Sequence, residues 1–300
     1  MSLLNKAVVT ALPFIPKSIV GQVAKRYIAG SALEDGIAAV QRLNKKTILA
    51  TMDLLGEDVK DAQETVAVQQ GILSLVEAIK NNRLVANVSL KPTQLGLAID
   101  KELAYRNIKI ILERAQQYDT FVRIDMEDAA MTNATLDLYR RVRSDGFQNV
   151  GVVIQAYLRR SEADVHALVK QGANIRLCKG IYDEPPAIAY KEREAIRNNY
   201  IKLLKFILES GSYIGIATHD DVLIDAAYRY ISELNLKPEQ YEFQMLLGVR
   251  EKRRDQTVRD GHRLRVYVPF GKDWHGYSTR RLKENPHMAW YITKAIFIHS

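Results

Sequence analysis

Thr47-Ile-Leu-Ala-Thr-Met-Asp-Leu-Leu-Gly56, followed by the segment from Glu57 to Asn82, sets the pattern for most of this chain. The first piece is apolar, contains β-branched residues and is closed by glycine, which is typical of a buried strand. The second piece carries apolar residues close to a 3.6-residue period, which predicts a helix. Together they form one strand followed by one helix.

The same unit recurs along the chain at spacings of roughly 30 residues. Eight strand candidates are each followed by a helix candidate, which predicts an α/β fold, a closed (β/α)8 barrel of the TIM type. An open doubly wound sheet is the alternative, but its Gly-rich phosphate turn is missing after the first strand. The further strands are expected at 87–91, 121–127, 150–157, 174–180, 213–219, 241–248 and 264–271. The helices are expected at 57–82, about 100–118, 132–144, 161–171 and 187–210, after 219, after 248 and after 271.

Length and composition fit one large domain with a small appendage. Residues 18–46 have helical spacing without strands, so we expect 1–46 to form an N-terminal helical arm and 47–300 to form the barrel. A hydrophobic content of 47% with 26% charged residues is typical of a globular protein. No apolar run approaches the ~20 residues needed to span a bilayer. Pro13 and Pro16 interrupt the short apolar start, which we interpret as mature protein.

Cysteine content and net charge limit the cellular compartment and the classes of partner that fit this chain. Cys178 is the single cysteine, which excludes a disulfide within the chain and favours a reducing cytosol. The net charge is +8, but the basic residues are scattered among 35 acidic ones. The dense cluster at 250–254 lacks the interleaved aromatic residues of a single-strand binder, so no nucleic-acid partner is expected. We interpret that cluster as a solvated helix face, with an anionic membrane surface as the alternative.

Polar residues gather where the expected strands end, which is where a barrel of this type places its active site. Several of them are hydrogen-bond donors, which suits a large polar cofactor with carbonyl and phosphate oxygens. A metal site is disfavoured because His219 has no partner His or Cys at ligand spacing, and no Gly-x-Ser-x-Gly hydrolase motif is present. The strand-end residues are Lys91, Asp125, Glu127, Gln155, Tyr157, Arg176, Lys179, Gly180, Thr218, His219, Asp220, Gln244 and Tyr267.

The last expected helix carries two adjacent arginines, Arg280 and Arg281, in its first turn. Two guanidinium groups side by side form planar donor forks that match a carboxylate or phosphate, which predicts a clamp for a small acidic substrate. The alternative is a solvated pair that contacts Glu284 one turn later.

Five motifs, in this order on successive strands, resemble the proline dehydrogenase family, and most closely its short, monofunctional bacterial form. The resemblance runs from about Thr47 to Pro286. The motifs are Asp125-Met-Glu127; Arg176-Leu-Cys-Lys-Gly-Ile-Tyr182; Ala217-Thr-His219; Phe243-Gln-Met-Leu-Leu-Gly248; and Tyr267-Val-Pro-Phe-Gly271 with Tyr277, Arg280, Arg281 and Glu284.

The resemblance implies a distorted barrel with FAD over the strand ends and the last helix over the barrel mouth. It implies oxidation of L-proline to 1-pyrroline-5-carboxylate by hydride transfer to the flavin, which is the first step of proline catabolism. It further implies that electrons pass to a membrane quinone, that a separate pyrroline-5-carboxylate dehydrogenase consumes the product, and that the enzyme is cytoplasmic and peripheral at the inner face of the membrane.

The resemblance also implies roles for residues of this chain. Lys91, Arg280 and Arg281 would hold the proline carboxylate, Tyr267 would cover the ring, and Asp125 and Arg176 would be the catalytic residues beside the flavin. No metal is implied. The residues that would bind FAD are Met126, Gln155, Arg176, Lys179, Gly180, Ile181, Tyr182, Thr218, His219, Gln244 and Glu284.

Two positions depart from the family pattern. Asp220 stands where asparagine is frequent, and Cys178 replaces an aliphatic residue. Two other functions compete with the flavoenzyme. An aldolase would use Lys91 or Lys179 as a Schiff-base lysine, and a nucleic-acid-binding protein would be supported by the net charge alone.

Overall fold

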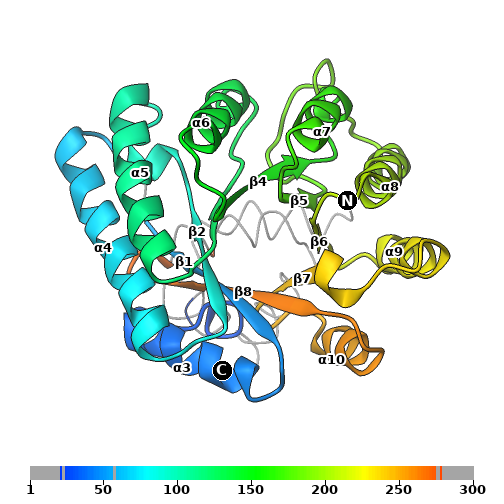
Figure 1. The fold of residues 1–300 in the computed structure, drawn as a ribbon, viewed down its shortest axis with the longest axis horizontal. Helices are drawn as coiled ribbons and strands as arrows, with labels where there is room; N and C mark the ends of the chain where they lie inside the picture. Colours follow the sequence, from blue (N-terminus) through cyan, green and yellow to red (C-terminus); the bar gives the residue numbers. More distant parts are fainter. Residues whose placement is uncertain (1–20, 22–23, 57–58, 275–277, 279–300) are drawn as a thin grey trace, which may run out of the picture.

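Eight parallel strands form a closed barrel in a computed structural model that describes residues 21, 24–56, 59–274 and 278. Each strand pairs with the next along the chain, and the last pairs with the first (Figure 1). The predicted TIM-type barrel is therefore confirmed. The strands are β1 (Leu49–Leu54), β2 (Ala86–Leu90), β3 (Val122–Ile124), β4 (Val150–Gln155), β5 (Ile175–Cys178), β6 (Ile214–Ala217), β7 (Tyr241–Leu246) and β8 (Leu264–Phe270).

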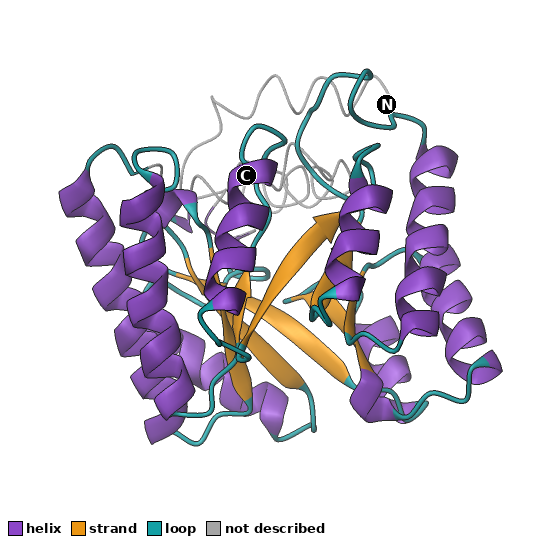
Figure 2. Cartoon of the chain, turned by 45° about the horizontal axis from the view of Figure 1, so that its top comes forward, coloured by secondary structure: helices purple, strands orange, loops and turns teal. Residues whose placement is uncertain are grey.

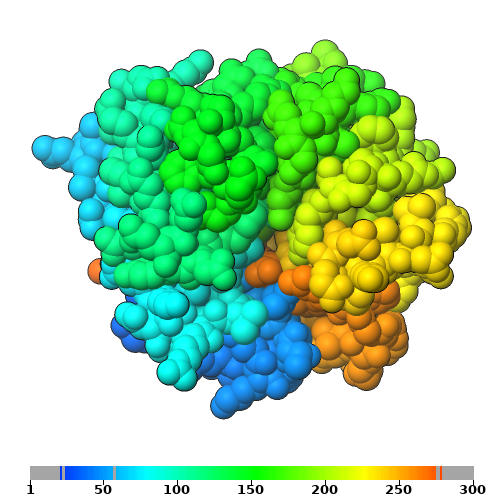
Figure 3. All heavy atoms as spheres, viewed as in Figure 1, coloured from blue at the N-terminus to red at the C-terminus, as the bar shows by residue number. Residues whose placement is uncertain are grey.

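A layer of helices surrounds the strands (Figure 2). The helices follow one another around the rim in sequence order (Figure 1), and the colours of the space-filling view follow the same order, from blue through green to orange (Figure 3). Of the helix expected after β8, the structure describes residues 272–274 and 278, and the rest lies outside the described residues. The seven that follow β1 to β7 are α4 (Ala62–Asn81), α5 (Lys101–Gln117), α6 (Thr132–Ser144), α7 (Ser161–Lys170), α8 (Arg193–Ser210), α9 (Asp221–Glu233) and α10 (Glu251–Arg259), with the short 3₁₀ helices η2 (Thr93–Leu95) and η3 (Pro238–Gln240) between them.

One helix of the expected N-terminal arm lies against the barrel. Helix α3 (Leu33–Asn44) precedes β1 and packs on β1 and β8, where the barrel closes. It buries Ala39, Val40 and Leu43 in the same hydrophobic core as the strands. Burial of an apolar stripe is the main source of stability for a helix of this length. The division of the chain at residue 46 stays a prediction.

Residues 24–30 of the arm lie across the ends of the last two strands. Ala24 and Ile28 pack with Leu55 and Trp274. Arg26 Nε donates to the carbonyl oxygen of Gly248 at 3.1 Å. Gly248 has a φ of 69°, and a Cβ there would overlap the Arg26 backbone, so a side chain at this position is excluded both by conformation and by space. The arm is thus attached at the carboxyl end of the barrel.

The inside of the barrel is polar, although apolar side chains usually fill it. Alternate residues of each strand point to opposite faces, so Ala50 and Met52 of β1 join the hydrophobic core while Thr51 and Asp53 lie on the other face. Contacts between strands that are not neighbours identify that second face as the interior. Its buried polar side chains include Thr51, Asp53, Asn87, Ser89, Arg123, Gln155, Arg176, Glu242 and Gln244, together with the less buried Arg265.

Hydrogen bonds between these side chains replace part of the hydrogen bonding to water that they lose on burial. Thr51 Oγ1 donates to Asn87 Oδ1, and Arg265 Nε donates to Glu242 Oε1 at 2.7 Å. Two glycines provide the space for the long side chains. A Cβ at Gly151 would overlap the guanidinium of Arg123, and a Cβ at Gly215 would overlap the side-chain amide of Gln244.

Candidate active site

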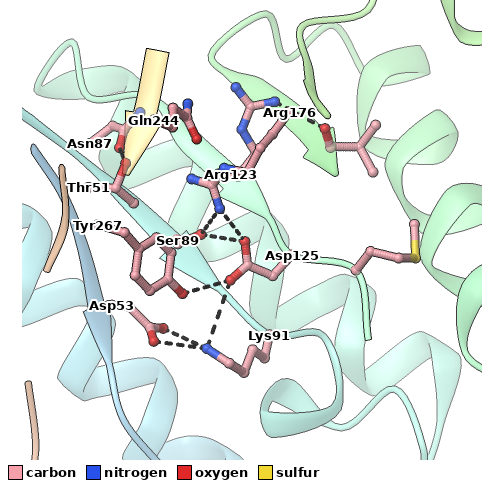
Figure 4. A network of polar contacts seen from close by, with 12 residues as sticks. Thr51, Asp53, Asn87, Ser89, Lys91, Arg123, Asp125, Arg176, Gln244 and Tyr267 are labelled. Carbon is pink, nitrogen blue, oxygen red and sulfur yellow. Dashed lines mark hydrogen bonds and ion pairs between the residues drawn. The ribbon is translucent and has the colours of Figure 1, made fainter. Parts of the chain in front are cut away.

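Six side chains from five strands meet inside the barrel near the carboxyl ends of those strands (Figure 4). They combine two cations, two carboxylates and two hydroxyl groups, and they are joined by hydrogen bonds and ion pairs. The six are Asp53 on β1, Ser89 on β2, Lys91 just after β2, Asp125 just after β3, Arg176 on β5 and Tyr267 on β8.

Asp125 is the centre of this network. Its Oδ1 accepts hydrogen bonds from Ser89 Oγ at 2.6 Å and from Arg176 Nη1 at 2.8 Å, and its Oδ2 accepts one from Tyr267 Oη at 2.8 Å. Its own backbone N–H donates to the carbonyl oxygen of Leu90, which fixes the residue one step beyond the end of β3. One carboxylate therefore holds a cation and a phenol in fixed positions.

Lys91 is paired with a carboxylate that the sequence analysis did not select. Its Nζ lies 2.8 and 2.9 Å from the two oxygens of Asp53 and 3.8 Å from Asp125 Oδ2. Burial by itself would lower the pKa of Lys91, but the carboxylates of Asp53 and Asp125 outweigh it and raise the pKa above its ordinary value. The ammonium therefore stays charged at neutral pH. An acid at an inward-facing position of an apolar strand was the signal that could have identified Asp53.

Arg176 has free hydrogen-bonding capacity within the described part of the chain. Its side chain is 7% exposed, and its Nη1 is engaged by Asp125, while Nε and Nη2 are buried without a partner there. The guanidinium carbon lies 5.3 Å from the centre of the Tyr267 ring. Buried unpaired donors are rare in native proteins, so an acceptor-rich ligand fits this position.

Gln155, at the end of β4, is a second site residue with a buried polar atom that has no partner among the described residues. Its Nε2 donates to the carbonyl oxygens of Met126 and Glu127 at 3.2 and 3.1 Å, and its Oε1 is buried without a partner among the described residues. Met126 is itself buried, and Glu127 accepts hydrogen bonds from Thr93. Burial raises the pKa of Glu127. A donor of a bound ligand would satisfy Gln155 Oε1.

The connection after β5 carries four of the expected cofactor residues. Lys179 and Gly180 are partly exposed, and Ile181 and Tyr182 are exposed. Gly180 has a φ of 105°, and a Cβ there would overlap the ring of Tyr157. Glycine is therefore required where this connection passes Tyr157.

Three more of the expected residues, Thr218, His219 and Gln244, follow β6 or lie on β7. His219 Nε2 accepts a hydrogen bond from the backbone N–H of Leu246 at 2.9 Å, and Thr218 Oγ1 accepts one from the N–H of Asp220 at 3.2 Å. Gln244 Nε2 donates to Glu242 Oε1 at 2.6 Å. These contacts fix the side chains at the same end of the barrel as Asp125.

Asp220 binds three basic side chains and caps helix α9. Its oxygens accept hydrogen bonds from Arg197 Nε and Nη2 at 2.9 and 2.8 Å and from Lys179 Nζ at 3.2 Å, and Arg193 lies 3.8 Å away. One oxygen also accepts from the N–H of Val222 in the first turn of α9. Burial alone would raise the pKa of Asp220, but the Arg197 and Lys179 contacts lower it to about 2. Lys179 was predicted from its place at a strand end, whereas Arg197, which lies on helix α8, was not.

Three of the four basic residues of the cluster at 250–254 are paired with nearby acids. Arg250 pairs with Asp221, and Arg253 pairs with Asp225, both on α9. Arg254 pairs with acidic residues of its own helix and is 5% exposed, so the expectation of a wholly solvated helix face is wrong for this residue. The cluster does not present a row of unpaired cations to a membrane.

The arginine pair and the acid that follows it, Arg280, Arg281 and Glu284, lie outside the described residues. The carboxylate clamp therefore stays a prediction. Lys91 and Tyr267, which the clamp would join, are both bonded to the Asp125 network.

The aldolase alternative is disfavoured by the pairing of both lysines. A Schiff-base lysine needs a neutral amine, whereas Asp53 holds Lys91 charged and Asp220 pairs with Lys179. Within the described ranges, no group of three or more His, Cys, Asp or Glu side chains is arranged to hold a metal ion. In the same ranges, no helix combines the length and apolar character needed to cross a membrane.

Comparison with known proteins gives one family throughout. Residues 37–291 match the family described as Proline dehydrogenase. Proline dehydrogenase 1 of Bacillus subtilis (strain 168) is 38% identical over 273 residues, which cover 91% of this chain and 90% of that protein. Proline dehydrogenase of Deinococcus radiodurans is 34% identical over 277 residues, with 91% and 89% covered.

A solved structure has the same fold. The crystal structure of proline utilization A (PutA) from Bdellovibrio bacteriovorus, inactivated by N-propargylglycine, superimposes with a TM-score of 0.82 at 25% identity. The match covers 88% of this chain and 33% of that one, so this chain spans about a third of the Bdellovibrio protein.

Proposed function

The chain belongs to the proline dehydrogenase family, and we propose that it is a short, monofunctional, FAD-dependent enzyme that oxidises L-proline to 1-pyrroline-5-carboxylate. Oxidation of proline is the first step of proline catabolism. The observation that carries the proposal is the network around Asp125, which brings Lys91, Arg176 and Tyr267 together at the strand ends.

The reaction removes a hydride from the carbon next to the ring nitrogen and a proton from that nitrogen. FAD, when bound, supplies the acceptor for the hydride. The protein orients the substrate, and fixing one end of a small ring limits the positions that its reacting carbon can take. Among the residues that the structure describes, Lys91 is suited to bind the proline carboxylate, because Asp53 keeps its ammonium charged. Tyr267, held through its hydroxyl by Asp125, covers the ring.

The residues near Asp125 are suited to hold FAD. Arg176 offers two buried donors, and Gln155 offers a buried acceptor, so a flat group rich in both acceptors and donors would satisfy them. The ammonium group of Lys179 would supply positive charge beside the phosphates of FAD. Besides Arg176, Gln155 and Lys179, we assign eight further residues to the FAD site: Met126, Gly180, Ile181, Tyr182, Thr218, His219, Gln244 and Glu284.

The enzyme passes electrons to a quinone and releases its product to a separate pyrroline-5-carboxylate dehydrogenase. We place it in the cytoplasm, peripheral at the inner face of the membrane. The net charge of +8 supports attraction to anionic lipid, although Arg250, Arg253 and Arg254 of the cluster at 250–254 are already paired with acids. In liposome flotation at low salt, recovery of all the protein in the unbound fraction would remove the membrane from this proposal.

The purified protein tests the proposed activity directly. We expect it to be yellow, to lose its flavin absorbance when L-proline is added without oxygen, and to form a product that reacts as an imine. Protein that is colourless and unchanged by added FAD and proline would overturn the proposal and favour the aldolase.

A further inference from the structure

Asp53 is placed to determine where the Lys91 ammonium points. It lies on β1 beside Ser89 of β2 in the strand register, with an exposed fraction of 1%. Both of its oxygens contact Nζ, at 2.8 and 2.9 Å, whereas the nearest Asp125 oxygen is 3.8 Å away. An ammonium has three donors, so the bidentate contact to Asp53 leaves capacity for a further acceptor.

The charges of the six-residue network balance, two cations against two carboxylates. Asp125 already accepts three hydrogen bonds, from Ser89, Arg176 and Tyr267. Without Asp53, the ammonium would have Asp125 as its nearest carboxylate. A shift of Nζ toward Asp125 would compete with Arg176 and Tyr267 for the same two oxygens.

We propose that Asp53 is the positioning residue of Lys91, holding Nζ apart from Asp125 so that the ammonium binds the carboxylate of the substrate while Asp125 keeps Arg176 and Tyr267 in place. This inference rests on the proposed function, because it assigns the carboxylate of proline to Lys91.

The pH dependence of an Asp53 variant separates positioning from general destabilisation. The charged or titratable groups that face Lys91 are Asp53 on β1, Asp125 and Glu127 after β3, and, through Asp125, Arg176 and Tyr267. Replacing Asp53 with asparagine removes the carboxylate that most strongly favours the charged amine, while burial still favours the neutral one. The ammonium of the variant therefore loses its proton at a lower pH than that of the wild type.

The experiment compares Asp53→Asn with Asp164→Asn in the FAD-loaded enzyme. Asp164 is a matched control, since it is also buried and bonded at both oxygens to an arginine, Arg160, but lies on α7 outside the barrel. For Asp53→Asn we expect the KM for proline to rise by on the order of tenfold or more. We expect the inhibition constant of cyclopentanecarboxylate, a ring acid without the nitrogen, to rise by a similar factor. The ratio of variant to wild-type kcat/KM should fall further as the pH increases, whereas for Asp164→Asn it should stay near one at every pH.

A second pair of variants covers the case in which Asp53→Asn fails to fold because it leaves Lys91 unpaired. Lys91→Met removes the charge of the lysine, and the double variant Asp53→Asn/Lys91→Met removes both charges of the ion pair. If Asp53 acts through Lys91, the double variant should have a proline KM within about twofold of that of Lys91→Met. A double variant that is tenfold worse than Lys91→Met would overturn the inference. So would an Asp53→Asn enzyme with unchanged KM, or with a pH-independent ratio. A wild-type protein that does not oxidise proline would instead overturn the proposed function.

Discussion

Asp125 connects four strands through a single side chain. It follows β3 and accepts hydrogen bonds from Ser89 on β2, Arg176 on β5 and Tyr267 on β8. An asparagine of the same shape has one acceptor oxygen and one donor group. Its amide N–H2 would therefore face a donor that the carboxylate now accepts from, either the hydroxyl of Tyr267 or the Ser89 and Arg176 groups.

Asp125→Asn is accordingly expected to lower kcat/KM for proline by roughly ten- to a hundredfold, because charge-assisted hydrogen bonds contribute roughly 1.5–3 kcal/mol. Steady-state kinetics with purified, flavin-loaded protein would measure this. The Asp164→Asn variant is the control for loss of a buried acid. Wild-type kinetics for Asp125→Asn would mean that the network does not serve the reaction.

Arg280→Met and Arg281→Met should each raise the KM for proline by on the order of tenfold or more, through loss of a charged fork that binds the carboxylate. The same steady-state assay measures the effect. Unchanged KM values in both variants would remove the arginine clamp and leave Lys91 as the carboxylate-binding residue.

In a barrel of this type the active site lies at the carboxyl ends of the strands. This rule is enough to predict that four polar side chains meet there, namely Lys91, Asp125, Arg176 and Tyr267. The same rule misses Asp53, because this residue lies within the apolar run of β1, not at its end. Asp53 pairs with Lys91, which follows the neighbouring strand β2, and sequence periodicity carries no information on the distance between two side chains. The roles of the site residues themselves stay predictions.

Helix α9 begins at a residue that serves two purposes. Asp220 caps its first turn and also binds Arg197 from α8, which joins two neighbouring outer helices at the mouth of the barrel. Asp100, which caps α5 through the N–H groups of Glu102 and Leu103, performs the first task alone. The two helices therefore provide a matched comparison.

Asp100→Ala should lower the free energy of unfolding by about 1 kcal/mol, as expected for a lost helix cap, and Asp220→Ala should lower it by more. Urea unfolding at pH 7 measures both. The pKa of Asp220 is lowered to about 2, below the ordinary value near 4, so its charged contacts stabilise the folded state above about pH 4 and are lost as the pH falls toward 2. The excess cost of Asp220→Ala should disappear over that interval. Equal costs for the two variants at pH 7 would contradict the bridging role.

The element boundaries show where periodicity is informative and where it is not. The strand expected at 121–127 ends at Ile124, since Asp125 keeps one backbone hydrogen bond to Leu90 of β2 but turns its side chain to the network. The helix expected from Ala187 begins at Arg193, because Ala189 forms an isolated bridge with Leu158. In both cases a contact with a distant part of the chain prevails over a local preference.

The barrel as a whole has a charged interior. Glu242 and Arg265, on the adjacent strands β7 and β8, form an ion pair with a separation of 2.7 Å. Burial alone would raise the pKa of Glu242, but Arg265 lowers it to about 2. Alternation of polar and apolar residues along β7 and β8 places Glu242 and Arg265 on the same face of the sheet, but it carries no information that the two side chains pair.

Glu242→Gln should therefore lower the free energy of unfolding at pH 7 by roughly 3–5 kcal/mol, the cost of leaving a buried partner charge without its counterion. The ordinary pKa of glutamate is near 4.3, so the contribution of the pair is complete above that pH and is lost as the pH falls toward 2. The gap between variant and wild type should close in the same interval, as chemical unfolding at several pH values would show. A gap that is constant down to pH 2 would mean that the effect is one of packing.

Closure of the barrel also fixes the order in which a newly made chain can complete its site. Strand β1 pairs on one side with β2, which is synthesised soon after it, and on the other with β8, where Leu49 lies beside Arg265. Asp53 and Lys91 can meet early, but Tyr267 reaches Asp125 only when the final strand leaves the ribosome. Until then β1 presents an open edge, the type of surface on which chains aggregate. The strand that finishes the site is thus also the one that protects the growing chain.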